Sequence, residues 1–238
     1  MISEALIESG SINTEKKLLK MQNNLIRLFQ QNLTIDVLIS SYKPKWLKKN
    51  SSSYFNHDNN LVENMENAFE DARYLCEQHY ISAPELEIVT RCDNTTFPYV
   101  PSHLYLIFFE LFKNSLRATC EKFENTERLP PIVVTVERED KNINVNISDD
   151  GGGMTDEQLI KAKLFFSTSA VLNNMSLYQG AHSSPLAGYG FGIGMVQIYT
   201  EYFGGTINIQ TSEGHGTSVK LNLPNETSTA LENLKCYD

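Results

Sequence analysis

The sequence predicts an α+β fold in which a mixed, largely antiparallel sheet has helices on one face: a two-layer α/β sandwich, preceded by a partial helical bundle. Two β-rich runs, 132–137 and 143–147, alternate apolar with polar residues and are separated by a short polar turn. Such runs are typical of antiparallel neighbours with one buried face. Amphipathic helical segments over 103–123 and 191–203 can cover that face. These elements therefore predict one sheet and one layer of helices.

Residues 1–97 are predicted to form the partial N-terminal helical bundle and a linker. Apolar residues recur at helical intervals between 14 and 42, which predicts two helices that meet near Asn32. The basic stretch 43–49 and the Ser- and Asn-rich stretch 50–60 are typical of a solvated connector. The remaining elements expected before residue 98 are an amphipathic helix over 61–81 and a strand over 85–90.

Residues 98–224 are predicted to form a second domain, followed by a C-terminal tail over 225–238. Its first helix, 103–123, combines an apolar face with a polar stripe, whose members fall at i, i+3, i+4 and i+7 and therefore share one side of the helix. The stripe consists of Glu110, Lys113, Asn114 and Arg117. The remaining elements expected are a helix over 155–165 with Thr155 as its N-cap and strands over 206–211 and 217–223.

Composition and charge exclude several classes of protein. A net charge of -9 and a pI near 5.1 argue against nucleic acid as a partner, because nucleic-acid-binding domains carry a basic face. No apolar run reaches transmembrane length. The four cysteines are widely spaced and include no CxxC pair, so neither a disulfide framework nor a zinc site is expected. Residues 1–8 contain two acids and no arginine, which fits neither a secretory signal nor a mitochondrial presequence.

Two glycine-rich segments point to a nucleotide. Asp149 ends a predicted strand and is followed by glycines at 151–153, so a ligand can approach its carboxylate without side-chain obstruction. That carboxylate can accept the exocyclic amine of adenine, although an ordinary Asp-Gly turn is the alternative. Four glycines alternate from Gly188 to Gly194 before a helix, where free N–H groups favour phosphate. The pattern is neither the dinucleotide fingerprint nor a Walker A loop. Together with the polar stripe, it predicts an ATP-binding module.

These segments resemble the four boxes of the ATPase superfamily that includes DNA gyrase B, Hsp90, histidine kinases and MutL. Residues 110–117 resemble the N box, 149–153 the first glycine box, 188–194 the lid box and 214–217 the last box. Residues 60–224, and 23–42 more weakly, are similar to the mitochondrial pyruvate dehydrogenase kinase and branched-chain α-ketoacid dehydrogenase kinase family. The segments that carry this similarity include Ala83-Pro-Glu-Leu-Glu87, Glu110-Leu-Phe-Lys-Asn-Ser-Leu-Arg-Ala-Thr119 and Pro185-Leu-Ala-Gly188.

The resemblance implies an ATP-dependent protein serine/threonine kinase that phosphorylates the E1α subunit of a mitochondrial 2-oxoacid dehydrogenase complex, with pyruvate dehydrogenase as the expected complex. It implies that Glu110 is the general base, that Asn114 holds Mg²⁺ and that Asp149 binds the adenine amine. The nucleotide contacts implied besides Asn114 and Asp149 are Glu110, Lys113, Arg117, Gly151, Gly153, Ser167, Thr168, Gly188, Tyr189, Gly190, Phe191, Gly192, Ile193 and Thr217.

The resemblance also implies an E2 lipoyl domain and a second copy of the chain as partners, and the mitochondrial matrix as the location. The chain departs from the family at two places near the site. Leu106 stands where the pyruvate dehydrogenase kinases carry a histidine one helical turn before Glu110, and Asp150 replaces an arginine. The part before Pro101 is also shorter than the family's helical bundle. A non-catalytic ATP-binding regulatory paralogue and a histidine kinase therefore stay open as alternatives.

Overall fold

The computed structural model gives the protein two compact units, formed by residues 1–51 and 52–238. In the first unit a single helix runs over 20–37. The prediction of two helices meeting near Asn32 is therefore wrong. Asn32 lies inside that helix, because one asparagine lowers helix propensity only modestly. The residues that the structure describes are 20–37, 39, 56, 58–124, 126, 128–163 and 192–225.

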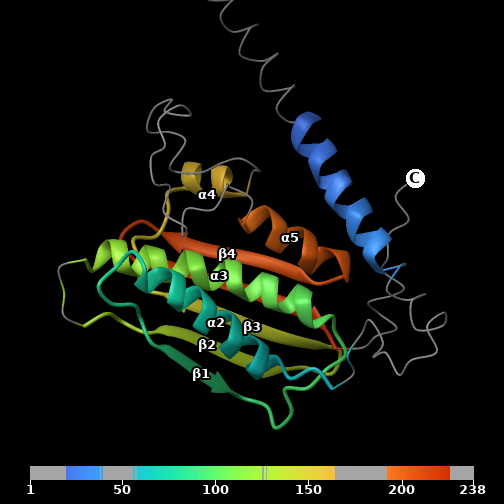
Figure 1. Ribbon diagram of the computed structural model, residues 1–238, viewed down its shortest axis with the longest axis horizontal. Coiled ribbons are helices and arrows are strands. Elements are labelled where there is room, and N and C mark those ends of the chain that lie inside the picture. The colour runs from blue at the N-terminus through green and yellow to red at the C-terminus, as the bar shows by residue number, and fades with distance from the viewer. Residues whose placement is uncertain are drawn as a thin grey trace, which may run out of the picture. The chain divides into compact units, whose positions relative to one another are not determined.

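The second unit is built on a five-stranded sheet with the order β1-β2-β3-β5-β4 (Figure 1). β1 and β2 are parallel, and every other pair of neighbours is antiparallel. This is the mixed, largely antiparallel sheet that the sequence predicts. The strands are β1 (Leu86–Thr90), β2 (Ile132–Arg138), β3 (Asn142–Asp149), β4 (Thr206–Ser212) and β5 (Gly216–Pro224).

The outer strand β1 precedes residue 98, where the sequence predicts a domain boundary. Main-chain pairing runs from Leu86 opposite Ile132 to Thr90 opposite Val136, so β1 continues the sheet formed by the later strands. The boundary at 97/98 itself stays a prediction.

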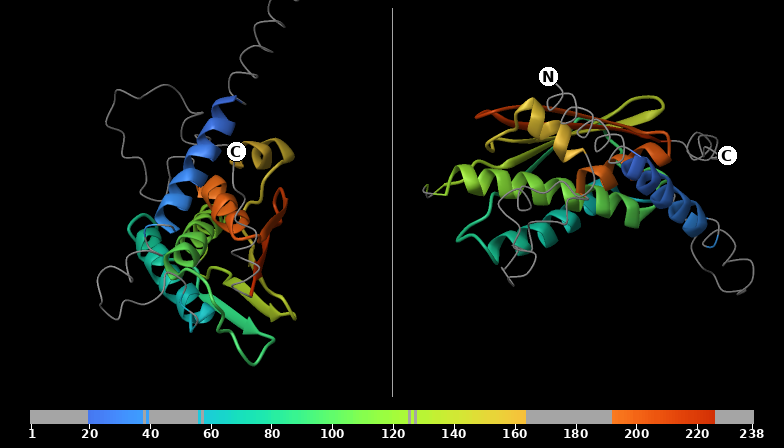
Figure 2. Two further views of the ribbon diagram at one scale, coloured as in Figure 1. Left: turned by 90° about the vertical axis from the view of Figure 1, so that its right-hand side faces the viewer. Right: turned by 90° about the horizontal axis from the view of Figure 1, so that it is seen from above.

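Helices α2, α3 and α5 lie on one face of the sheet (Figures 1 and 2), which confirms the predicted two-layer arrangement. α3 contacts both α2 and α5. α4 begins at a capping box in which Thr155, the predicted N-cap, and Gln158 bind each other's backbone N–H groups. None of the helices in the described part of the chain is long and apolar enough to cross a membrane. The helices are α2 (Leu61–Glu77), α3 (Pro101–Lys122), α4 (Asp156–Ala162) and α5 (Gly192–Tyr202).

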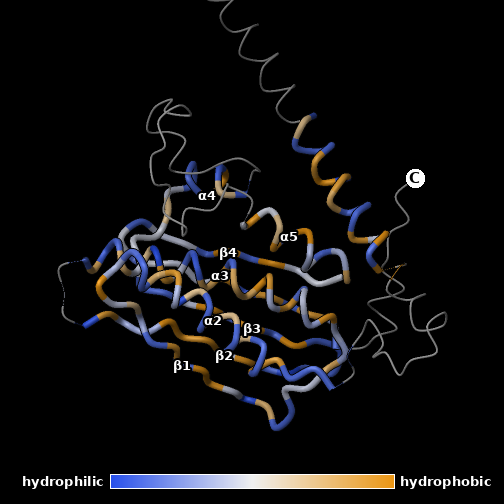
Figure 3. The backbone as a smooth tube through the Cα atoms, in the orientation of Figure 1, coloured by the Kyte–Doolittle hydropathy of each residue, from blue (hydrophilic) through white to orange (hydrophobic). Residues whose placement is uncertain are grey.

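The core forms where the sheet meets α3, and apolar residues concentrate along β2, β3 and α3 (Figure 3). Every second residue of β2 and β3 is buried, as strand periodicity requires. α2 packs against α3, where the rings of Phe69 and Phe112 meet edge to face with centroids 5.3 Å apart. The fully or almost fully buried apolar side chains of α3 are Leu104, Ile107, Phe108, Leu111, Phe112, Leu116 and Cys120.

The register of β3 and β5 determines where the carboxylate of Asp149 lies. Asp149 is the last residue of β3 and pairs with Thr217 of β5. Because side chains alternate between the faces of a strand, Asp149 shares its face with the buried Ile147 and Val145. The Asp149 side chain is therefore on the helix-covered face, at the end of the sheet where the chain turns.

Replacing Phe112 with alanine tests the α2–α3 contact. The side chain is fully buried and stacks edge to face on Phe69, so Phe112→Ala should lower the free energy of unfolding by about 3–5 kcal/mol, the usual cost of such a truncation. Urea unfolding followed by circular dichroism measures it. Tyr74→Ala, on the exposed side of α2, is the matched control and should change stability by no more than about 0.5 kcal/mol. Equal effects of the two substitutions would contradict this packing.

Candidate nucleotide-binding site

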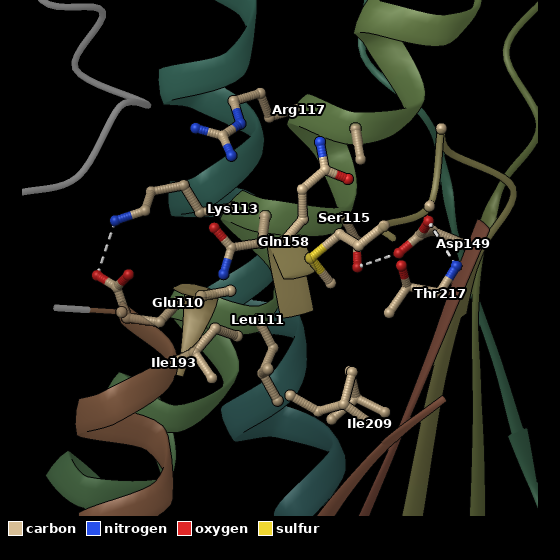
Figure 4. A pocket seen from close by; sticks show the side chains of 18 of the residues that line it. Glu110, Leu111, Lys113, Ser115, Arg117, Asp149, Gln158, Ile193, Ile209 and Thr217 are labelled. Carbon is tan, nitrogen blue, oxygen red and sulfur yellow. Dashed lines mark hydrogen bonds and ion pairs between the residues drawn. The ribbon is translucent and has the colours of Figure 1, made fainter. Parts of the chain in front are cut away.

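A pocket of about 600 Å³ lies between α3, the end of β3, α4 and the start of α5 (Figure 4). Its volume is within the usual range for small-molecule sites, and it combines an apolar floor with a few polar groups, as such sites do. The apolar lining comes from Leu111, Ala118, Met154, Ala162, Ile193, Ile209 and Val219, and the polar lining includes Glu110, Lys113, Asn114, Ser115, Arg117, Asp149, Gln158 and Thr217.

Three donors from three different segments converge on the Asp149 carboxylate. Ser115 Oγ of α3 donates to Oδ2 at 2.9 Å, and the backbone N–H groups of Gly151 and Thr217 donate to Oδ1 at 3.0 and 3.2 Å. Burial raises the pKa of the Asp149 carboxyl above its ordinary value, although all three hydrogen bonds favour the charged form. Each carboxylate oxygen has two lone pairs, so Oδ2 still has room for a second donor, such as an exocyclic amine.

The second polar group of the pocket is an ion pair on α3. Lys113 Nζ lies 2.7 Å from Glu110 Oε1, and their side chains are only 8% and 20% exposed. The pair holds the Glu110 carboxylate against the beginning of α5, where a Cβ added at Gly192 would lie 2.6 Å from Oε2. Glu110 therefore has a defined position at the end of the pocket away from Asp149 (Figure 4).

Asn114 lines the pocket from the same side of α3 as Glu110 and is suited to hold a metal ion. Its side chain lines the pocket and makes no hydrogen bond to the other residues that the structure describes. An amide oxygen is a hard ligand of the kind that Mg²⁺ accepts. Arg117, one turn further along α3, has its Nε 3.7 Å from Glu121 Oε1, which is too long for a hydrogen bond. The pocket thus offers an amide oxygen and two cationic groups, Lys113 and Arg117, to an anionic ligand.

Most of the predicted site residues lie together in this pocket. Gly151 reaches it through its hydrogen bond to Asp149. Ser167, Thr168, Gly188, Tyr189, Gly190 and Phe191 lie outside the described residues. The predicted residues that line the pocket are Glu110, Lys113, Asn114, Arg117, Asp149, Gly153, Gly192, Ile193 and Thr217. Their roles stay predictions.

Sequence reasoning missed several residues of the pocket. Ser115 directly follows Asn114 in α3. A hydroxyl at a buried position of an amphipathic helix was the available signal. Ile209 and Val219 are paired across β4 and β5, and strand alternation alone would have placed them on the same face as Thr217. Lys122 had no sequence signal, because the groups it binds are backbone carbonyls.

A family model of known proteins matches this part of the chain. The model describes histidine kinase-, DNA gyrase B-, and HSP90-like ATPases, and it matches residues 99–227, more than half of the chain. The match includes α3, the end of β3, α4, the start of α5 and the strands β4 and β5, which contribute the residues that line the pocket.

The chain is also similar to several curated kinases. It is 38% identical to the mitochondrial [pyruvate dehydrogenase (acetyl-transferring)] kinase of Drosophila melanogaster over 75% of this chain and 44% of that protein. It is 39% identical to the corresponding kinase of Arabidopsis thaliana over 68% of this chain and 45% of that protein. It is 30% identical to isozyme 1 of Rattus norvegicus over 92% and 52%, respectively. The chain thus spans about half the length of the curated relatives it matches.

The raised pKa of Asp149 predicts a pH dependence of definite sign. A carboxyl whose pKa is higher in the folded than in the unfolded protein holds its proton more tightly when folded. Its contribution to stability is full below the ordinary aspartate value, 3.8, and is lost as the pH rises through the raised native value. Urea unfolding of wild type and Asp149→Asn should therefore show wild type losing stability relative to the variant as the pH rises from that value toward neutrality.

Asp150→Asn, which removes one carboxylate from the same turn, should show the same loss of stability with rising pH in weaker form, because the Asp150 charge contributes to the raised pKa of Asp149. The difference between wild type and Asp149→Asn cancels the titration of all other groups to first order. If that difference were constant with pH, or grew in favour of wild type as the pH rises, the raised pKa would be wrong.

Proposed function

Because the chain belongs to the family of histidine kinase-, DNA gyrase B- and HSP90-like ATPases, we propose that its pocket binds MgATP for a protein serine/threonine kinase reaction. The proposed substrate is the E1α subunit of a mitochondrial 2-oxoacid dehydrogenase complex, with pyruvate dehydrogenase as the expected complex. The observation that carries the proposal is that Asp149 and the polar stripe of α3 line a single pocket of suitable volume. The similarity to proteins named as mitochondrial pyruvate dehydrogenase kinases supports the substrate class.

Adenine is proposed to bind at the Asp149 end of the pocket. Its exocyclic amine would donate to the carboxylate, which Ser115, Gly151 and Thr217 hold in place. The apolar side chains around it, such as Ile209, would cover the faces of the base. A buried acceptor of this kind discriminates strongly, since a base without the amine would leave the carboxylate without that donor.

The phosphates are proposed to lie toward Asn114, Lys113 and Arg117. Mg²⁺, when bound, supplies charge neutralisation on the phosphate oxygens, and Asn114 Oδ1 would hold it. The Lys113 ammonium and the Arg117 guanidinium add positive charge on the same face of α3. In phosphoryl transfer, positioning and neutralisation of this kind account for most of the rate enhancement.

Glu110 is proposed to be the general base that accepts the proton of the substrate hydroxyl. It lies one helical turn before Asn114, so both side chains line the pocket from the same side of α3. Leu106 provides no imidazole one turn earlier, and Lys113, at 2.7 Å, is the neighbour that orients the carboxylate. A base of this kind must be within hydrogen-bond reach of the hydroxyl in the bound complex.

A non-catalytic ATP-binding regulatory protein is the second candidate. Two observations favour it: Leu106 replaces the histidine expected beside the base, and the ion pair with Lys113 occupies Glu110 Oε1.

A histidine kinase has less support. His103 of α3 is buried, and burial lowers its pKa to about 4, which does not suit an accessible phosphoacceptor. Under the leading proposal the location is the mitochondrial matrix, and further partners are an E2 lipoyl domain and a second copy of the chain.

Asn114→Ala tests the metal site. Because the Asn114 side chain makes no hydrogen bond to the other described residues, the substitution should leave the unfolding transition nearly unchanged while abolishing binding of MgATP measured by calorimetry. Gln197→Ala on α5, a polar-to-alanine change outside the pocket, is the matched control and should bind as wild type does. An MgATP affinity of Asn114→Ala equal to that of wild type would exclude this role.

Glu110→Gln tests both the base and the proposed function. In an assay that follows transfer of the γ-phosphate from MgATP to purified E1α, wild type should label a serine of E1α. Glu110→Gln should retain MgATP binding and lose transfer by about 10²-fold or more, as loss of a positioned base does. Transfer by Glu110→Gln at the wild-type rate would refute the assignment of the base. A wild type that binds MgATP but labels no E1α substrate would favour the non-catalytic candidate.

A further inference from the structure

The ammonium group of Lys122 binds three backbone carbonyl oxygens at the edge of the pocket. Its Nζ donates to Asp150 O at 2.7 Å, to Gly151 O at 3.3 Å and to Gly214 O at 3.0 Å. An ammonium has three N–H donors, so these contacts account for all of them. Two acceptors belong to the glycine turn after β3 and the third to the turn between β4 and β5. One side chain of α3 therefore joins both turns.

The same two turns position the N–H groups that bind Asp149. Gly151 lies in the first turn and Thr217 directly follows the second, and both donate to Asp149 Oδ1. The turns also contact each other, since Gly214 N–H donates to Gly152 O at 2.7 Å. The position of both donors therefore depends on how the pair of turns is held against α3.

Two glycines at these turns, Gly151 and Gly216, have no room for a side chain. A Cβ added at Gly216, where φ is +91°, would lie 2.0 Å from Asp149 O, and one added at Gly151 would lie 2.7 Å from the Cβ of Ala118. Packing this close excludes side chains at these two glycines, and contacts from α3 add to the backbone hydrogen bonds that hold the turns. Ala118 and Lys122, at i and i+4 of α3, provide these contacts from one side of the helix.

Lys161 shows how a different lysine of the same pocket behaves. Its Nζ pairs with Glu157 at 2.6 Å, and the two side chains are 44% and 77% exposed. An exposed pair within one short helix contributes little. Lys122 is exposed as well, but it binds carbonyl groups of two segments that are far apart in the sequence, and its charge strengthens these hydrogen bonds.

We infer that Lys122 is a positioning residue for the adenine end of the pocket, an inference that rests on the proposed function. By holding both turns on α3, it keeps the N–H groups of Gly151 and Thr217 on Asp149 and so fixes the carboxylate that accepts the adenine amine. Lys122 acts through the adenine end and not through the phosphates. Its loss therefore weakens the binding of any ligand that contains adenine, whether or not that ligand carries phosphate.

The experiment compares MgATP with adenosine, which carries no phosphate. Binding of each to the full chain is measured by NMR titration for wild type, Lys122→Met and Lys220→Met, with thermal unfolding in parallel. We expect Lys122→Met to lower the affinity for both ligands by about tenfold, the loss that one charge-assisted hydrogen bond represents, with the unfolding temperature nearly unchanged. Lys220→Met removes the same charge from an exposed position of β5 outside the pocket and should leave the adenosine affinity unchanged. In the transfer assay, Lys122→Met should raise the KM for MgATP and preserve kcat.

Three results would overturn the inference. A loss of affinity for MgATP alone would mean that Lys122 acts through its charge on the phosphates. Unchanged affinity for both ligands would mean that the turns hold without it. A loss accompanied by a large fall in unfolding temperature would mean a general structural role. Failure of the proposed function would look different, because wild type itself would then bind neither MgATP nor adenosine, and that result would overturn both.

Discussion

The buried carboxylate of Asp149 is the group on which the rest of the site depends. It is only 7% exposed, and an ionised group at such a position is costly unless donors replace the water it loses. Ser115 of α3, Gly151 of the glycine turn and Thr217 of β5 supply those donors. These three segments must each place a donor on the carboxylate for Asp149 to be buried. The register of the sheet is therefore coupled to the packing of α3.

Helix α3 serves the core and the pocket at the same time. Phe108, Phe112 and Leu116 pack into the interior, while Glu110 and Asn114 line the pocket. The helix contacts α2, α5 and the strands β2, β3 and β5, so it is packed on several sides. Polar side chains placed on a rigid element keep their geometry better than those on loops. The packing of the apolar face of α3 therefore fixes the positions from which the polar side chains on its other face line the pocket.

The parts of this structure that could be predicted from the sequence are those that depend on local periodicity. Alternation along β3 placed Asp149 at a strand end, and helical spacing placed Glu110 and Asn114 on one side of a helix. The pairing of Asp149 with Thr217 depends on register between strands 68 residues apart, which alternation does not specify. The role of Lys122 could not be predicted for a related reason, since its backbone partners lie 28 to 92 residues away in the sequence. The error at Asn32 came from giving one polar residue more weight than its propensity supports.

A crystal structure of the chain with Mg²⁺ and a non-hydrolysable ATP analogue tests the central claim most directly. The account predicts that the adenine amine donates to the Asp149 carboxylate and that the phosphates lie beside Lys113 and Asn114, with Mg²⁺ on the Asn114 side-chain oxygen. An analogue bound outside this pocket, or bound with its adenine away from Asp149, would contradict the account.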